Sequence, residues 1–328
     1  MNKFRTIFLS YLLLITISFA QDKVKYDGYA EVGAQGKYKQ IRVESFYRAK
    51  LEVSFDVTKK TEVQLDMRGN SEDENIEFHQ ILIKYDVVPG VKIKFGNIKK
   101  RYGLEEKTSR EKLQVMNHSL VNSYLSTLGY ASSDNGLQVI LENDDREFTG
   151  GVYYNESDNA TVIADFTEKD FIGLDEAGIN LNYIHFGVED IENGFTGNIY
   201  ADYKHKHWEN SLEVFYGFNP VETVYLRRSK DAGSVKFMAV KAMCSYEFKF
   251  DNEFVTGIEP VIQGCILIPD DGITKVKKTQ LLMGANIYFD KKIRLMINGD
   301  MIVSNNRTNP DESYLTGSNV VVQVQVRW

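Results

Sequence analysis

The sequence is short of proline, of cysteine and of long apolar runs. It has five prolines and two cysteines in 328 residues, against 19 tyrosines and 19 phenylalanines. Because proline interrupts strands and aromatic residues favour them, this composition is typical of long antiparallel strands with aromatic girdles at membrane interfaces. After residue 20, no stretch approaches the roughly 18 consecutive apolar residues of a helical membrane span. The sequence therefore predicts no transmembrane helix.

The single apolar run lies near the N-terminus and has the pattern of an export signal. Lys3 and Arg5 precede the apolar residues 7–19, and the small residues Ser18 and Ala20 stand at the positions that a signal peptidase prefers. The run is too short for the roughly 20 residues of a spanning helix. We expect residues 1–20 to be a signal peptide, removed before the mature domain 21–328. An uncleaved N-terminal anchor is the alternative.

An exported chain without spanning helices is either a soluble domain or a closed barrel, because no other backbone arrangement crosses a bilayer. Without Lys3 and Arg5, the 39 Lys and Arg residues fall to 37 against 46 Asp and Glu, a net charge of −9. This acidic balance argues against a nucleic-acid partner. It remains compatible with a barrel, since polar residues can line a lumen.

Side chains alternate between apolar and polar along most of the sequence, which is the period of a β-strand. In residues 42–57 one face is apolar, and the other carries Arg42, Arg48 and Lys50 among acidic neighbours. A soluble sandwich also shows alternation, but sixteen residues exceed its usual strand length of about 5–6. Long strands are normal in a barrel that crosses a membrane. The same phasing puts Cys244 and Cys265 on opposite faces, which predicts two free thiols.

The pattern predicts 16 strands, within a range of 14–18. We place them near 24–34, 41–57, 61–68, 76–86, 91–98, 136–143, 148–154, 159–167, 177–187, 195–204, 207–216, 235–250, 254–268, 276–289, 292–303 and 318–328. Even-numbered junctions are mostly tight and odd-numbered ones mostly long, although 155–158 and 168–176 break this rhythm. Short turns on one side and long loops on the other are typical of a transmembrane antiparallel β-barrel of the bacterial outer membrane. The closing amphipathic strand, which ends on Trp328, agrees with this interpretation.

The longest junction, residues 99–135, is the third external loop of such a barrel. Around its start the sequence has Gly96 and Lys99, then Arg101, the stretch Tyr102-Gly103-Leu104-Glu105, and Thr108-Ser109. This segment resembles the phosphate-selective porin (porin O/P) family, which has a strand, then a glycine, a lysine, a Pro-Phe-Gly-Leu-Glu stretch and Thr-Ser, so that Arg101 replaces the family proline. The final VVVQVQVRW also resembles the family. The resemblance implies a 16-stranded, homotrimeric channel whose third loop folds into the lumen and attracts anions through its basic residues.

The residues themselves support a basic filter. The segment from residue 92 to residue 112 contains eight basic and three acidic side chains, which gives a local charge of +5. Rings of Lys and Arg favour anions in a pore with low-dielectric walls. The predicted solute-binding residues are Lys92, Lys94, Lys99, Lys100, Arg101, Lys107, Arg110, Lys112, Arg42 and Arg48. Because acidic residues share the lumen face, a mixed-charge lumen that only holds water is the alternative. Phosphate selectivity depends on the charges of the loop, where Arg101 departs from the family.

Other chemistry has little support in the sequence. His205 and His207 flank a predicted turn, where a metal would need a third ligand, and His118-Ser119 is the only cluster that suggests a hydrolase. Nucleotide-binding and common hydrolase motifs are absent. We therefore expect a porin for passive diffusion of small hydrophilic or anionic solutes, with lipid as its surroundings and no catalysis, cofactor or metal. A non-conducting structural or adhesive barrel is the alternative.

Overall fold

The computed structural model describes residues 24–37, 43–71, 76–155, 158–187, 193–220, 223, 234–270, 276–305 and 313–328. The predicted signal peptide and Arg42 lie outside these ranges. Within them, no helix is both long and apolar enough to span a bilayer.

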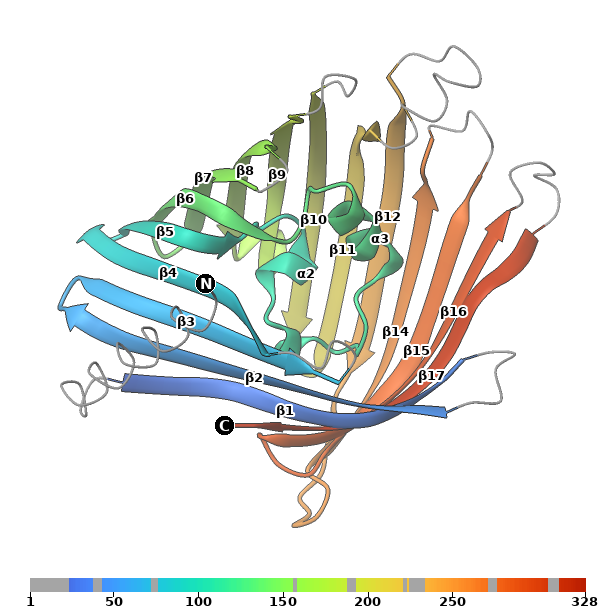
Figure 1. Cartoon of the computed structure of the whole chain (residues 1–328). Helices are drawn as coiled ribbons and strands as arrows, with labels where there is room; N and C mark the ends of the chain where they lie inside the picture. Colours follow the sequence, from blue (N-terminus) through green and yellow to red (C-terminus); the bar gives the residue numbers. More distant parts are fainter. Residues whose placement is uncertain are drawn as a thin grey trace.

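The described chain is one antiparallel sheet that closes on itself (Figure 1). Each strand pairs with the next along the chain, and the first strand also pairs with the last, from Tyr29 opposite Arg327 to Lys37 opposite Asn319. The strands are β1 Val24–Lys37, β2 Val43–Thr58, β3 Thr61–Asn70, β4 Ile76–Val88, β5 Val91–Lys99, β6 Ser133–Glu142, β7 Arg146–Tyr154, β8 Ala160–Lys169, β9 Glu176–His185, β10 Gly194–His205, β11 Trp208–Phe218, β12 Lys236–Tyr246, β13 Phe248–Lys249, β14 Gly257–Ile268, β15 Lys278–Tyr288, β16 Ile293–Asn305 and β17 Ser313–Arg327.

The barrel has sixteen strands, because β12 and β13 are two parts of one strand. Both pair with β14, and only Glu247 separates them. The predicted strand count is therefore confirmed, and each predicted strand overlaps an observed one. The long junction between β8 and β9 is real: it contains the short helix η2, Phe171–Gly173, and Asp170 and Ile172 adopt left-handed backbone angles there.

The two faces of the sheet differ as the alternation predicts. In β17, Val322 and Val324 are exposed on the outside, whereas the intervening Gln323 and Gln325 are buried. The same alternation leaves an apolar outer surface on most strands, and this is the surface that a bilayer requires. Cys244 and Cys265 are both free thiols, as predicted.

One long segment lies inside the ring of strands. It connects β5 to β6 and carries α2 Leu104–Lys107, η1 Arg110–Lys112 and α3 Leu120–Thr127. Figure 1 shows α2 and α3 within the barrel, in front of β10 to β12. Their contacts with the barrel wall are the basis of the site described next.

Candidate pore constriction

The third loop, residues 100–132, leaves β5 and turns at once into the barrel. The buried Lys100 ammonium donates to the Gly129 carbonyl and the Asp134 carboxylate, both at 2.7 Å, and so ties the two ends of the loop together. Burial lowers the pKa of Lys100 more than Asp134 raises it. Tyr102, two residues after Lys100, is fully buried, and its hydroxyl oxygen lies 2.7 Å from Thr196 Oγ1 on β10.

Gly103 makes the sharp entry into α2 possible. Its φ is +83°, which side chains rarely tolerate, and a Cβ there would lie 3.0 Å from Glu213 Oε2 and 3.3 Å from the Phe215 ring. The Gly103 amide donates to Asn180 on β9, and the Leu104 amide donates to Glu213 on β11. The first turn of α2 is therefore fixed by polar side chains that point inward from the wall.

A buried charge network holds α2 in place. The Lys241 ammonium on β12 pairs with Glu213 and lies 3.4 Å from Glu105 Oε1. Glu105 also accepts hydrogen bonds from the amide and hydroxyl of Ser119 and lies 3.8 Å from His118 Nδ1. Burial alone would raise the pKa of Glu105, but Lys241, His118 and Ser119 lower it to about 2. Glu105 is therefore an ionised, fully partnered anchor.

The rest of the loop docks on the same side. The Met116 amide donates to Asn298 on β16, and the Leu120 amide at the start of α3 donates to Gln280 on β15. Ser119 caps α3 by accepting from the Asn122 amide. We call the strands that hold the loop, β9–β12 and β14–β16, the docked wall.

Apolar side chains complete the docked wall. Val121 and Leu125 of α3 belong to a buried cluster with Phe215, Phe237 and Leu267, which point inward from β11, β12 and β14. These inward apolar residues were not identified from the sequence. Their signal was available, because an apolar residue in the lumen-facing phase of a barrel strand needs something other than water to cover it. They mark where a loop docks.

The opposite wall, β2–β6, is left open to a cavity of about 460 Å³, which we call the open-wall cavity. Five predicted site residues line it: Lys94, Lys99, Arg101, Lys107 and Arg110. With the further basic residues Lys50, Arg68 and Lys84, the lining holds eight Lys or Arg and three acidic residues, Glu52, Asp66 and Glu106. The lining thus holds more basic than acidic side chains, although the chain as a whole is acidic.

A second cavity continues from the first toward the short turns. This turn-side cavity, about 470 Å³, is lined by Lys59 and Lys60 of the β2–β3 turn and by Lys92. Lys84, Lys94 and Arg101 line both cavities, so these three side chains stand where the two cavities meet. Lys92 is paired with Glu142.

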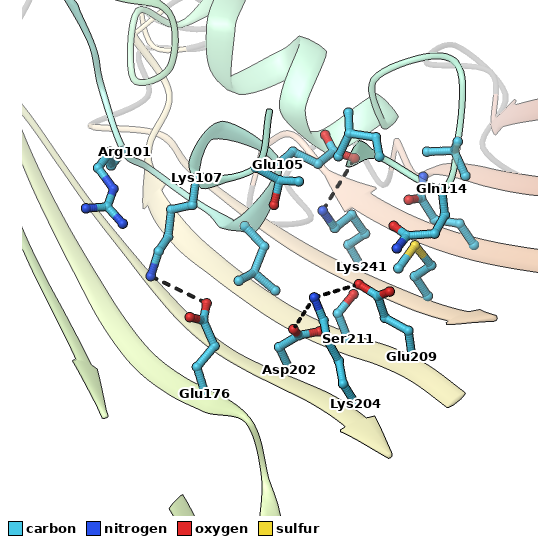
Figure 2. Close-up of a pocket in the computed structure, with 16 residues that line it drawn as sticks. Arg101, Glu105, Lys107, Gln114, Glu176, Asp202, Lys204, Glu209, Ser211 and Lys241 are labelled. Atoms are coloured by element: carbon cyan, nitrogen blue, oxygen red, sulfur yellow. Dashed lines mark ion pairs between the residues drawn. The ribbon is translucent and has the colours of Figure 1, made fainter. Parts of the chain in front are cut away.

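A third, smaller cavity of about 230 Å³ lies below α2, against the docked wall. Figure 2 shows its charges pairing with one another. Lys107 reaches Glu176 at 3.5 Å, and Lys204 lies 3.3 Å from Asp202 and 2.9 Å from Glu209. This side of the lumen is therefore internally neutralised.

Several predicted site residues lie away from these cavities. Lys100 is buried at the base of the loop and does not line them, because its ammonium is needed to join the loop ends. Lys112 is exposed and also lines none of the three cavities. Arg48 lies 4.6 Å from the centre of the Phe46 ring. Arg42 lies outside the described residues.

The suggested hydrolase cluster has a structural role. The Ser119 hydroxyl donates to Glu105 and accepts from the Asn122 amide, and it is fully buried. His118 contacts Asn122 at 3.1 Å. Among the described residues, no group of three metal-ligating side chains comes together.

Known structures share the whole architecture. OprB of Pseudomonas putida at high pH aligns with a TM-score of 0.67 over 94% of this chain and 95% of that chain, at 10% identity. The anion-selective porin from Comamonas acidovorans gives 0.62 over 93% and 98%, at 13% identity. OmpT of Vibrio cholerae, in a trimer form, gives 0.61 over 93% and 99%, at 11% identity. Identities this low show a common fold. No curated protein matches the sequence.

The closed barrel, its apolar outer face and its polar lumen define a transmembrane β-barrel of the porin fold. More specifically, the chain belongs to the family of phosphate-selective porins O and P, whose profile matches residues 20–206, more than half of the sequence.

Proposed function

We propose that this porin passes small hydrophilic solutes by diffusion and prefers anions. The observation that carries the proposal is the lining of the open-wall cavity, with eight Lys or Arg against three acidic residues. Fixed cations beside a narrow aqueous path, bounded by a low-dielectric wall, raise the local anion concentration and lower the cation concentration. The anion-selective Comamonas porin with the same fold supports this proposal.

The third loop narrows the path in this proposal. It covers the docked wall, so solutes pass between α2 and the open wall and then into the turn-side cavity. Phosphate is one candidate solute, supported by the name of the family. Lys94 and Arg101 are the predicted site residues that border both parts of this path, since each lines the open-wall cavity and the turn-side cavity.

Planar-bilayer recording tests the proposal. Purified protein in a KCl gradient should conduct, and its reversal potential should show a higher permeability for chloride than for potassium. Replacing chloride by phosphate or sulfate then ranks the anions. A conducting pore with equal permeabilities would leave the porin function but remove the anion preference. A barrel that carries no current would favour the structural or adhesive alternative.

We also propose that residues 1–20 are removed on export and that the mature barrels form a homotrimer in the outer membrane. The pattern of residues 1–20 and the trimer form of OmpT support these two points. N-terminal sequencing of protein from outer membranes should begin at Gln21. The mass of the detergent complex should correspond to three chains, and a monomer mass would contradict the trimer.

A further inference from the structure

The cations of the open-wall cavity differ in how far they are neutralised. Seven of the eight have a carboxylate within 4 Å. The pairs are Lys50–Glu52, Arg68–Asp66, Lys84–Glu62, Lys99–Glu106, Arg101–Glu147, Lys107 with Asp165 and Glu176, and Arg110–Glu31. Within the described part of the chain, Lys94 alone among the eight has no hydrogen bond or ion pair. An ion pair presents little net charge to a passing ion, whereas an unpaired ammonium presents a full one.

The place of Lys94 in the barrel adds to this. It lies in the middle of β5 and lines both the open-wall cavity and the turn-side cavity, so its side chain borders the passage between them. In the sheet, Lys94 lies directly opposite Lys84 on β4 and directly opposite Gln138 on β6. Two lysines directly opposite one another destabilise a sheet. Lys94 therefore gains no stability from its neighbours on the lumen face.

We infer that Lys94 is the residue that contacts the passing anion and sets the anion preference. The basic residues of the third loop that line the open-wall cavity, Arg101, Lys107 and Arg110, contribute little because carboxylates neutralise them. This inference deepens the proposed function and rests on it. The ligand class is a small anion that exchanges quickly. A single ammonium on a flexible stem binds an anion as a point charge and does not replace its full hydration shell.

The test compares four variants by reversal potential in a KCl gradient. Lys94→Gln should lower the chloride-to-potassium permeability ratio about 25-fold, because one unit charge at about 4 Å in water raises the local concentration of chloride about fivefold and lowers that of potassium by the same factor. Lys94→Arg keeps the charge and should retain the ratio. The double variant Lys84→Gln with Glu62→Gln removes an already neutral pair bordering the same cavity, and should leave the ratio unchanged.

A rescue sharpens the test. Adding Glu147→Gln to Lys94→Gln leaves Arg101 without its carboxylate partner at the same junction, and should restore most of the preference. Block of the chloride current by sulfate provides a second readout, and Lys94→Gln should weaken it about tenfold, as expected for loss of one charged contact.

The outcomes separate the two claims. If the unmodified pore shows no anion preference, the proposed function fails. If it prefers anions but Lys94→Gln keeps the ratio and the sulfate block, only the inference about Lys94 fails. If Lys84→Gln with Glu62→Gln lowers the ratio as much as Lys94→Gln, the preference depends on the lining as a whole and the inference is also overturned.

Discussion

The two walls of the lumen use the same residue types in opposite ways. On the docked wall, Lys241 is fully enclosed between Glu105 and Glu213, and its charge fixes a loop. On the open wall, Lys94 faces a cavity of about 460 Å³. A lysine on a barrel strand therefore stabilises structure where a loop removes water, and borders the open cavity where no loop covers it. The face of the strand alone does not distinguish the two.

Removing the charge at the centre of the docked wall should have the largest effect. Lys241→Met leaves Glu105 and Glu213 buried without their common cation, and loss of one partner of a buried pair costs about 3–5 kcal/mol. We expect this loss in the free energy of unfolding, measured by urea titration in lipid vesicles, together with noisier single-channel currents as the loop leaves the wall. Unchanged currents would mean that other contacts suffice to hold α2.

Acid should act on the same network. Because the pKa of Glu105 falls from 4.5 to about 2 in the folded protein, its contribution to docking is complete above pH 4.5 and is lost as the pH falls toward 2. We expect current noise to increase over this range in recordings at stepped pH. Glu105→Gln should show the noise already at neutral pH and respond less to acid. If the current noise of the unmodified pore does not change with pH, ionised Glu105 is not needed to hold the loop on the docked wall.

A smaller effect is expected where the loop enters. Gly103→Ala places a Cβ at a φ of +83° and 3.0 Å from Glu213 Oε2, so it should destabilise the docked loop by about 1–3 kcal/mol. Limited proteolysis of the loop should then become faster, while the barrel itself still resists unfolding. Gly36→Ala is a matched control, since a Cβ at Gly36 meets no atom within 4 Å. Equal effects in both variants would contradict the role assigned to Gly103.

The smallest effect should come from the open wall. Lys84→Gln breaks a partly exposed pair with Glu62, and such pairs contribute about 0–1 kcal/mol. Measured by the same urea titration as Lys241→Met, it should change the free energy of unfolding several times less. A loss as large as that of Lys241→Met would show that the open wall is as important to stability as the docked wall, and the contrast between the walls would disappear.

The sequence predicts the barrel well because the period of two is set by the backbone. One apolar face and one polar face appear in residues 42–57 and again in β17, and this alternation does not depend on the path of the loops. The site is predicted less well, since the path of the third loop depends on contacts over more than 100 residues, such as Leu104 with Glu213. Lys100 shows the limit: it stands beside Lys99 in the sequence, yet it closes the base of the loop.

The closure of the sheet also sets a constraint on the order of folding. β1 is hydrogen-bonded to β17, and the Trp328 amide donates to the Gly28 carbonyl, so the first strand meets a partner that is synthesised last. Each of the other neighbouring strand pairs joins strands that are consecutive in the sequence. The β1–β17 pair, which we call the seam, joins residues separated by nearly the whole chain. Such distant contacts are the slow ones to form. Until the seam has formed, the unpaired edges of β1 and β17 are therefore open to pairing with other chains.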